Sequence, residues 1–321
     1  MNKIWNLPIT HLMPFSEIDE KRPALLVTSS PAWNAVENKL RFKPAIKIEV
    51  TAADTTHWDS LLSTVHVQPS VVYAIGGGLV ADASKYMAVK LGLAMVCLPT
   101  AFSVDAFITP TSAIRKDGCV YYIETKPPEN LILDLDVIAA APASIRAAGI
   151  TDVVSIATGS WDWQFAHQQG RNPPGMEFIP WVYDNAQSIL NSALDCAEAA
   201  GRGDRAGLKT LYDCLSLEVQ LCNQIGHSRP EEGSEHYFAY AVENEMGHGL
   251  PHGSLVGPGI LLFADRQGQK VDFLRQALSA CNIPLNSIPP DIVRRTFDSL
   301  PAFCQKHNLP FGIAHTLERT C

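Results

Sequence analysis

Short apolar runs alternate with polar or helix-like segments over the first 140 residues. The runs cover residues 24–30, 45–50, 71–75, 93–98 and 131–135, and most are rich in the aliphatic side chains typical of buried strands. Strands separated by helix-like segments are typical of a parallel sheet covered by helices. A further run at 119–124 predicts an antiparallel ribbon. The pattern therefore predicts an α/β domain over residues 1–140.

The pattern changes after residue 137, because no further strand-like run appears. The remaining apolar positions have helical spacing over residues 142–169, 184–200, 204–226, 234–246, 252–283 and 290–307. We therefore expect a second domain, all helical, over residues 141–321.

Three consecutive glycines, Gly76, Gly77 and Gly78, lie between the run at 71–75 and a helix-like segment. Backbone N–H groups at a helix start attract phosphate, and glycine lets a ligand approach the backbone closely. Three glycines could also form a tight turn and nothing more. Asp82 is predicted in the first turn of this helix, and Lys85 could contact a phosphate or pair with Asp82.

Polar residues follow the next predicted strand, at Thr100, Ser103 and Asp105. In an open parallel sheet the carboxyl ends of neighbouring strands line one crevice, so these residues are expected beside the glycines. Hydroxyl groups there can bind ribose or amide groups, although Ser103 and Asp105 could instead cap a turn. The first domain is therefore predicted to bind a dinucleotide.

The helical half offers one carboxylate and two imidazoles from separate helices. Asp152 lies at a predicted helix start, His236 just inside a second helix, and His252 at the start of a third. Such a set can hold a metal with an open coordination position, as a catalytic metal requires. The spacing alone leaves the alternatives open, namely a capped core histidine for His236 and a helix-terminal charge for Asp152.

Charge and composition restrict the partners and the compartment. A net charge of -8 and a pI near 5.7 argue against nucleic-acid or anionic-membrane binding. No apolar run of about 18 residues is present, and polar residues interrupt the N-terminus where a signal peptide would be apolar. The eight cysteines are dispersed without CxxC spacing and are predicted to be reduced core thiols. We expect a cytoplasmic protein with no nucleic-acid or membrane partner.

The motifs together resemble the iron-containing alcohol dehydrogenase and dehydroquinate synthase-like superfamily, and within it the sn-glycerol-1-phosphate dehydrogenases. The matching runs between about residues 71 and 260 are GGGxxxDxxK, PTxxSxDAF, PENLILDLDVI, the segment from Gly149 to Trp163, and SRPxxGSEH…HG. The resemblance implies a dehydroquinate synthase-like fold, with a Rossmann-like nucleotide-binding domain, a helical domain and an active site between them. It also implies a metal-dependent, NAD(P)-linked oxidoreductase that transfers hydride between nicotinamide and a small polyol, a polyol phosphate or a related hydroxy or keto compound.

The resemblance also implies roles for individual residues. The residues expected at the dinucleotide are Gly76, Gly77, Gly78, Asp82, Lys85, Thr100, Ser103 and Thr109. The expected metal ligands are Asp152, His236 and His252, and the candidate catalytic residues are Asp105, Tyr240 and His248. Zinc is the expected divalent metal, with iron or nickel as alternatives, and the cofactor is NAD or NADP. A homo-oligomer acting on a small polyol or phosphorylated substrate is expected.

Some positions depart from the family pattern or stay ambiguous. Tyr240 replaces a second family histidine one helical turn after His236, and Glu232 replaces a small residue, so a glycerol phosphate substrate should not be assumed. His248 is a candidate proton relay or a plain surface histidine. Arg229 could hold a phosphate but is expected to be a solvated surface charge.

Two other functions are weighed against the dehydrogenase. A dehydroquinate synthase-like synthase or lyase would reduce and reoxidise NAD within one turnover, but those enzymes have a glutamate at the first metal position and several lysines that this chain lacks. A non-catalytic nucleotide-binding or assembly protein is disfavoured, because all three expected metal ligands are present.

Overall fold

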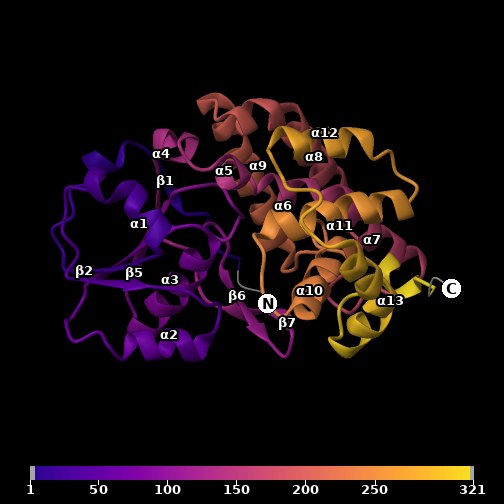
Figure 1. The fold of residues 1–321 in the computed structure, drawn as a ribbon, viewed down its shortest axis with the longest axis horizontal. Coiled ribbons are helices and arrows are strands. Elements are labelled where there is room, and N and C mark those ends of the chain that lie inside the picture. Colours follow the sequence, from indigo (N-terminus) through magenta and orange to yellow (C-terminus); the bar gives the residue numbers. More distant parts are fainter. Residues whose placement is uncertain (1–3, 319–321) are drawn as a thin grey trace. The chain divides into compact units, whose positions relative to one another are not determined.

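The computed structural model describes residues 4–318 (Figure 1). The chain forms two compact units, one of Trp5–Pro142 and the other of the described residues from Ala143 onward together with Ile4. Every strand of the described chain lies in the first unit, and the second is helical. The α/β and all-helical character expected from the sequence is confirmed.

Six parallel strands form one sheet in the first unit, in the order β1-β8-β5-β4-β2-β3. Their bounds are β1 (Ile9–Leu12), β2 (Ala24–Thr28), β3 (Ile46–Glu49), β4 (Val71–Gly76), β5 (Ala94–Pro99) and β8 (Asn130–Leu133). All residues of β2 and β4 are buried, because these strands lie inside the sheet. Parallel pairing brings the carboxyl ends of β4 and β5 together, with Gly76 opposite Pro99.

The remaining elements of the first unit connect and extend the sheet. Its helices are α1 (Ser30–Val36), α2 (Thr55–Leu62), α3 (Gly78–Leu91) and α4 (Leu135–Ala139), with 3-10 helices at Phe15–Glu17 and Glu37–Lys39. An antiparallel hairpin of β6 (Thr111–Lys116) and β7 (Cys119–Glu124) confirms the predicted ribbon. Five sheet strands match predicted runs, whereas β1 was missed, because it has four residues and none of them is fully buried.

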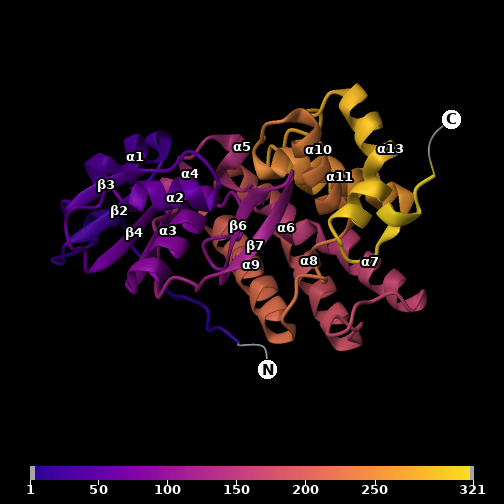
Figure 2. The ribbon, with the colours of Figure 1, turned by 90° about the horizontal axis from the view of Figure 1, so that it is seen from below.

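Nine helices make up most of the second unit, α5 (Ala143–Arg146), α6 (Ile150–Val154), α7 (Ile156–Gln168), α8 (Pro180–Arg202), α9 (Arg205–Ile225), α10 (Ser234–Met246), α11 (His252–Arg266), α12 (Asp272–Ala280) and α13 (Pro290–Lys306), before a 3-10 helix at Ile313–Thr316. The long helices α8 and α9 lie side by side (Figure 2), joined by a left-handed Gly203 and by Asp204, which caps α9. No helix in residues 4–318 combines the length and the apolar character that crossing a bilayer requires.

Two predicted helices are wrong in extent. The segment 142–169 contains three helices rather than one, and 252–283 contains two. In the second case Gly268 adopts a positive φ of 72° just after α11 ends at Arg266. Apolar spacing continues across such breaks, so periodicity alone did not reveal them. The seven cysteines in the described range carry free thiols, as predicted.

Candidate functional site

The triple glycine forms the turn between β4 and α3. The helix begins at Gly78, with Gly77 as its N-cap. A Cβ at Gly77 would lie 2.9 Å from Ser103 Oγ, and one at Gly78 would lie 2.5 Å from Val104 Cγ2. Glycine is therefore required here, because the 103–104 loop packs against the turn. The N-cap of α3 makes no side-chain hydrogen bond to the first N–H groups of the helix, and such an N-terminus can accommodate a phosphate.

The polar residues after β5 lie beside this turn. The Thr100 N–H donates to the Gly76 carbonyl at 3.2 Å, and Ser103 is the neighbour of Gly77 described above. Both side chains are half-buried, as is Asp105, whose carbonyl accepts a turn hydrogen bond from Ile108 N at 2.8 Å. The structure thus brings Thr100 and Ser103 next to the glycines, while their contact with a dinucleotide stays a prediction.

Asp82 and Lys85 form a buried ion pair. Asp82 lies in the second turn of α3, so the predicted position in the first turn is wrong, because the helix begins as early as Gly78. Lys85 Nζ lies 3.0 Å from Asp82 Oδ1 and also donates to Thr109 Oγ1 at 2.9 Å and to the Thr111 carbonyl. Burial raises the pKa of Asp82, and Lys85 opposes this rise. Of the two roles considered for Lys85, the structure shows the pairing, and a contact of Lys85, Asp82 or Thr109 with the cofactor stays a prediction.

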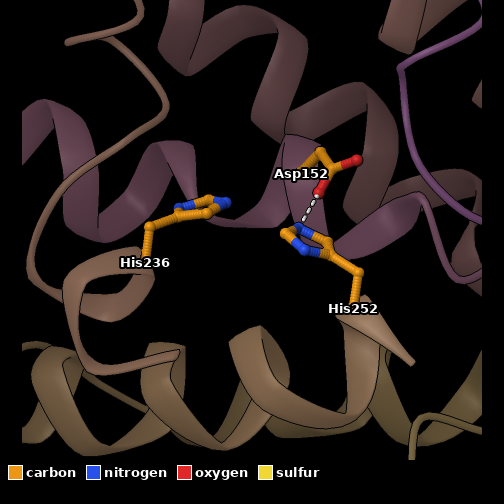
Figure 3. A group of neighbouring side chains, drawn as sticks. All are labelled: Asp152, His236 and His252. Atoms are coloured by element: carbon orange, nitrogen blue, oxygen red, sulfur yellow. Dashed lines mark hydrogen bonds and ion pairs between the residues drawn. The ribbon is translucent and has the colours of Figure 1, made fainter. Parts of the chain in front are cut away.

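The second unit brings Asp152, His236 and His252 together from α6, α10 and α11 (Figure 3). One potential ligand atom from each lies within 4.8 Å of the others. His252 Nε2 is 2.8 Å from Asp152 Oδ1, and the two imidazole centroids are 5.4 Å apart. Asp152 and His236 are each 6% exposed, whereas the His252 side chain is 28% exposed. The cluster is therefore buried on two sides and accessible beside His252.

Close helix packing positions these three side chains. Ser155 Oγ donates to the Asp152 carbonyl at 2.6 Å and to the Glu231 carbonyl, which ties the end of α6 to the loop before α10. A Cβ at Gly159 would lie 2.6 Å from the Glu231 carbonyl carbon, and one at Gly259 would lie 2.8 Å from the Glu235 carbonyl oxygen. Gly159 thus lets α7 approach the loop before α10, and Gly259 lets α11 approach α10 itself, closely enough for the cluster to form.

Asp162, in the middle of α7, anchors the start of α10. Its Oδ2 accepts hydrogen bonds from both N–H and Oγ of Ser234, and its Oδ1 accepts from Ile313 N at 2.9 Å. Burial and the nearby Glu235 carboxylate raise the pKa of Asp162 to about 6, although the hydrogen bonds favour its charged form. No sequence motif assigns this residue a role, although its place between two tryptophans indicates that it is buried.

His236 sits among carboxylates. Its Nδ1 is 2.9 Å from Glu235 Oε1, which leaves Nε2 for the cluster, and Figure 3 shows one ring nitrogen facing Asp152 and His252. Burial alone would lower the pKa of His236, but the hydrogen bond to Glu235 and the charges of Glu235, Glu232 and Asp152 outweigh it and raise the pKa to about 9. The site therefore favours positive charge. Sequence analysis also missed Glu235, although it immediately precedes His236.

Tyr240 and Glu232 pair beside His236. Tyr240 Oη donates to Glu232 Oε1 at 2.7 Å, and Ser228 Oγ donates to Glu232 Oε2 at 2.6 Å. The Tyr240 and His236 ring centroids are 6.2 Å apart, one helical turn along α10. The phenol and the carboxylate that depart from the family pattern thus contact each other.

Two other candidate residues, His248 and Arg229, are not members of the cluster. His248 is exposed, with Nδ1 3.4 Å from the Gly249 carbonyl, and the structure does not include it in the cluster. Arg229 is 2% exposed, so the expectation of a solvated charge is wrong. Its guanidinium donates to Tyr237 Oη at 3.2 Å and to the Phe311 carbonyl at 2.7 Å, and these acceptors offset part of the cost of its burial.

The chain is similar to one described family and to several named dehydrogenases. The model of the family described as iron-containing alcohol dehydrogenase matches residues 9–142. A glycerol-1-phosphate dehydrogenase [NAD(P)+] of Sulfurisphaera tokodaii is 31% identical over 228 residues, covering 70% of this chain and 64% of that protein. One from Saccharolobus islandicus is 27% identical over 279 residues, covering 85% and 78%. The chain thus spans slightly less than two thirds of the first relative.

Solved structures share the fold at low sequence identity. A probable glycerol dehydrogenase from Sinorhizobium meliloti 1021 has a TM-score of 0.69 at 16% identity, covering 100% of this chain and 95% of that one. A sulfoacetaldehyde reductase from Bifidobacterium kashiwanohense, solved in complex with NAD+, has a TM-score of 0.65 at 16% identity, covering 96% and 94%.

The parallel sheet with its glycine turn and the helical unit with its Asp–His–His cluster together define a dehydroquinate synthase-like fold. Within that fold, residues 9–142 match the iron-containing alcohol dehydrogenase family, and the chain is similar to glycerol-1-phosphate dehydrogenases.

Proposed function

We propose that the protein is a metal-dependent, NAD(P)-linked oxidoreductase that transfers hydride between nicotinamide and a small polyol, a polyol phosphate or a related hydroxy or keto compound. The observation that carries the proposal is the convergence of Asp152, His236 and His252 within 4.8 Å. The family and the names of the relatives, which are NAD(P)-dependent dehydrogenases, support the reaction type.

The donor set of the cluster fits a divalent metal. One carboxylate oxygen and two imidazole nitrogens are suitable ligands for zinc, iron or nickel, and three protein ligands leave a coordination position for substrate. Glu235 fixes Nδ1 of His236, so that Nε2 is the nitrogen available for coordination. When bound, the metal would lower the pKa of a substrate hydroxyl and polarise a carbonyl. We propose zinc as this metal, with iron or nickel as the alternatives that metal analysis would identify.

The residues around the cluster support the handling of a polyol. Tyr240 donates its phenol proton to Glu232, so its oxygen can accept a hydrogen bond from a substrate hydroxyl, and Glu232 can accept another, because each carboxylate oxygen has two lone pairs. We propose that Asp105 orients a substrate hydroxyl and that His248 relays a proton to solvent, consistent with its exposure. We also propose that the glycine turn, Thr100 and Ser103 hold NAD or NADP, and that Asp82, Lys85 and Thr109 support that site.

The family resemblance supports a homo-oligomer and a cytoplasmic location as further parts of the proposal. Light scattering of the purified protein measures the first directly. A single-chain mass across a concentration series would contradict it.

The test combines metal analysis with a nicotinamide absorbance assay. Purified protein is expected to hold one divalent metal per chain and to change the nicotinamide absorbance with a member of a panel of polyols, hydroxy acids, ketones and their phosphates. Asp152→Ala, His236→Ala and His252→Ala are each expected to lose both metal and activity. Glu245→Gln, on the exposed face of α10, is the control that should keep both.

Two outcomes contradict the proposal in different ways. If one of the three alanine variants keeps its full metal content, the substituted residue is not a metal ligand. A tightly bound metal without any nicotinamide change across the panel argues for the synthase or lyase reaction, in which the cofactor is regenerated in each turnover.

A further inference from the structure

The Glu235 carboxylate is the most deeply buried acidic group beside the metal cluster. The residue has no exposed surface. Its Oε1 accepts hydrogen bonds from Gly233 N at 2.6 Å and from His236 Nδ1 at 2.9 Å. The bond to Gly233 holds the carboxylate at the start of α10, so its position is set by the backbone and not by the imidazole. The carboxylate therefore fixes the direction of the His236 ring.

The second oxygen of this carboxylate has no hydrogen-bond partner within residues 4–318. A fully buried carboxylate with one unsatisfied oxygen is costly unless positive charge lies nearby. A Cβ placed on Gly233 would lie 3.2 Å from Glu235 Oε2 and 3.0 Å from Asp162 Oδ2, so a second buried carboxylate lies near the first. The hydrogen bonds within the chain do not fully satisfy this group.

A cation bound at Nε2 of His236 would balance this charge. It would withdraw electrons from the imidazole and strengthen the Nδ1–H bond to Glu235, while Glu235 would make the ring a better ligand. We propose that Glu235 is a positioning residue for the metal, which orients His236 through Nδ1 and raises the affinity of the cluster. This inference rests on the metal site of the proposed function and extends the role of Glu235 from fixing Nδ1 of His236 to setting the metal affinity of the cluster.

A simpler role for Glu235 would be to cap α10 through Gly233. A cap affects the stability of the helix but not the affinity for a metal. Glu235→Gln separates the two roles, because the amide oxygen can still accept from Gly233 N while the negative charge is lost. Glu235→Asp is the complementary variant, since it keeps the charge but withdraws it from His236 by one methylene group.

The experiment measures Zn²⁺ affinity of the metal-free protein by competition with a chromophoric chelator, and the visible spectrum of the Co²⁺-substituted protein. Glu235→Gln is expected to bind Zn²⁺ about 10- to 100-fold more weakly and to change the Co²⁺ spectrum. Glu245→Gln, on the same helix, is the matched control and should match the wild type in both. Thermal unfolding of the metal-free proteins shows whether the fold is retained.

A Glu235→Gln protein that binds Zn²⁺ within twofold of the wild type overturns the proposal. If Glu235→Gln does not fold, the Zn²⁺ affinity of Glu235→Asp is measured instead, and an affinity within twofold of the wild type overturns the proposal. Failure of the metal site itself has a different signature, because the wild type would then bind no Zn²⁺, or the His236→Ala variant would bind it as tightly as the wild type.

Discussion

Both units of the molecule contain buried carboxylates, but the basic partners of these carboxylates differ between the two units. In the first unit Asp82 meets the ammonium of Lys85 at 3.0 Å, on the same helix, and Thr109 and Thr111 accept the other hydrogen bonds of that ammonium. In the second unit Asp152 and Glu235 meet imidazoles, which carry charge only when they are protonated or bound to a cation.

The difference separates a structural ion pair from a proposed metal site. A lysine supplies a permanent charge from within the chain, so the group around Asp82 has its cation when the unit folds. Around His236 three carboxylates, those of Glu235, Glu232 and Asp152, all favour positive charge. A divalent cation would supply more positive charge to these three carboxylates than the single imidazolium of His236 can. The second group is therefore the one expected to respond to metal.

The largest expected effect is the loss of the internal cation. Lys85→Met leaves Asp82 buried without its ammonium partner, and should lower the free energy of unfolding by about 3–5 kcal/mol, measured by urea denaturation. Lys90→Met, on the exposed side of α3, is the control and should cost much less than Lys85→Met, because solvent screens the Lys90 charge. The double variant Asp82→Leu/Lys85→Met should recover much of the loss. If Lys85→Met costs no more than Lys90→Met, the pair is not a structural element.

Removal of the metal from the cluster of Asp152, His236 and His252 should lower the free energy of unfolding by a similar amount. At a free metal concentration 1,000 times Kd, binding stabilises the folded state by about 4 kcal/mol, which a chelator would remove. Thermal unfolding with and without chelator measures the effect. His252→Ala should unfold at the same temperature in both conditions, whereas Lys85→Met should still respond. If the unfolding temperature of the wild-type protein does not change with chelator, the cluster around His236 does not bind a stabilising metal, and the proposed distinction from the Asp82–Lys85 pair is wrong.

The buried carboxylate of Asp162 should make the free energy of unfolding depend on pH. Its pKa rises from 3.8 to about 6 on folding, so the folded state holds this proton more tightly than the unfolded chain does. Its contribution to stability is therefore full below about pH 4 and is lost as the pH rises towards about 6, by about 3 kcal/mol. Asp162→Asn should lack this loss, as urea unfolding at several pH values in chelator would show. Parallel pH profiles of the two proteins would contradict the prediction.

The smallest expected effect on stability comes from loss of the hydrogen bond between Tyr240 and Glu232. Tyr240→Phe removes the hydrogen bond to Glu232 and should cost about 1 kcal/mol, because water can reach the half-buried carboxylate. Ser228→Ala removes the other bond to Glu232 and is the matched comparison. If Tyr240 also contacts substrate, Tyr240→Phe alone should raise KM. An equal change of KM in both variants would assign the effect to Glu232 instead.

Part of the site could be predicted because local sequence encodes it. Apolar spacing distinguished the strands from the helices, the glycines indicated the β4–α3 turn, and the expected starts of α10 and α11 placed His236 and His252. The breaks at 147–149 and near Gly268 were missed, because apolar spacing persists across a short break. The strand β1 was missed because an exposed four-residue edge has little pattern.

The sequence by itself determined the kinds of elements, the order in which they occur and the residue types available for chemistry. Tertiary structure decided which charges are matched. Asp152 and His252 are 100 positions apart and lie 2.8 Å from each other through helix packing, and the burial of Arg229 depends on Phe311, 82 positions further along the chain. Periodicity and helix ends depend on neighbours in the sequence, whereas charge compensation depends on neighbours in space. The balanced pair at Lys85 and the unbalanced cluster at His236 could therefore be told apart only in the folded protein.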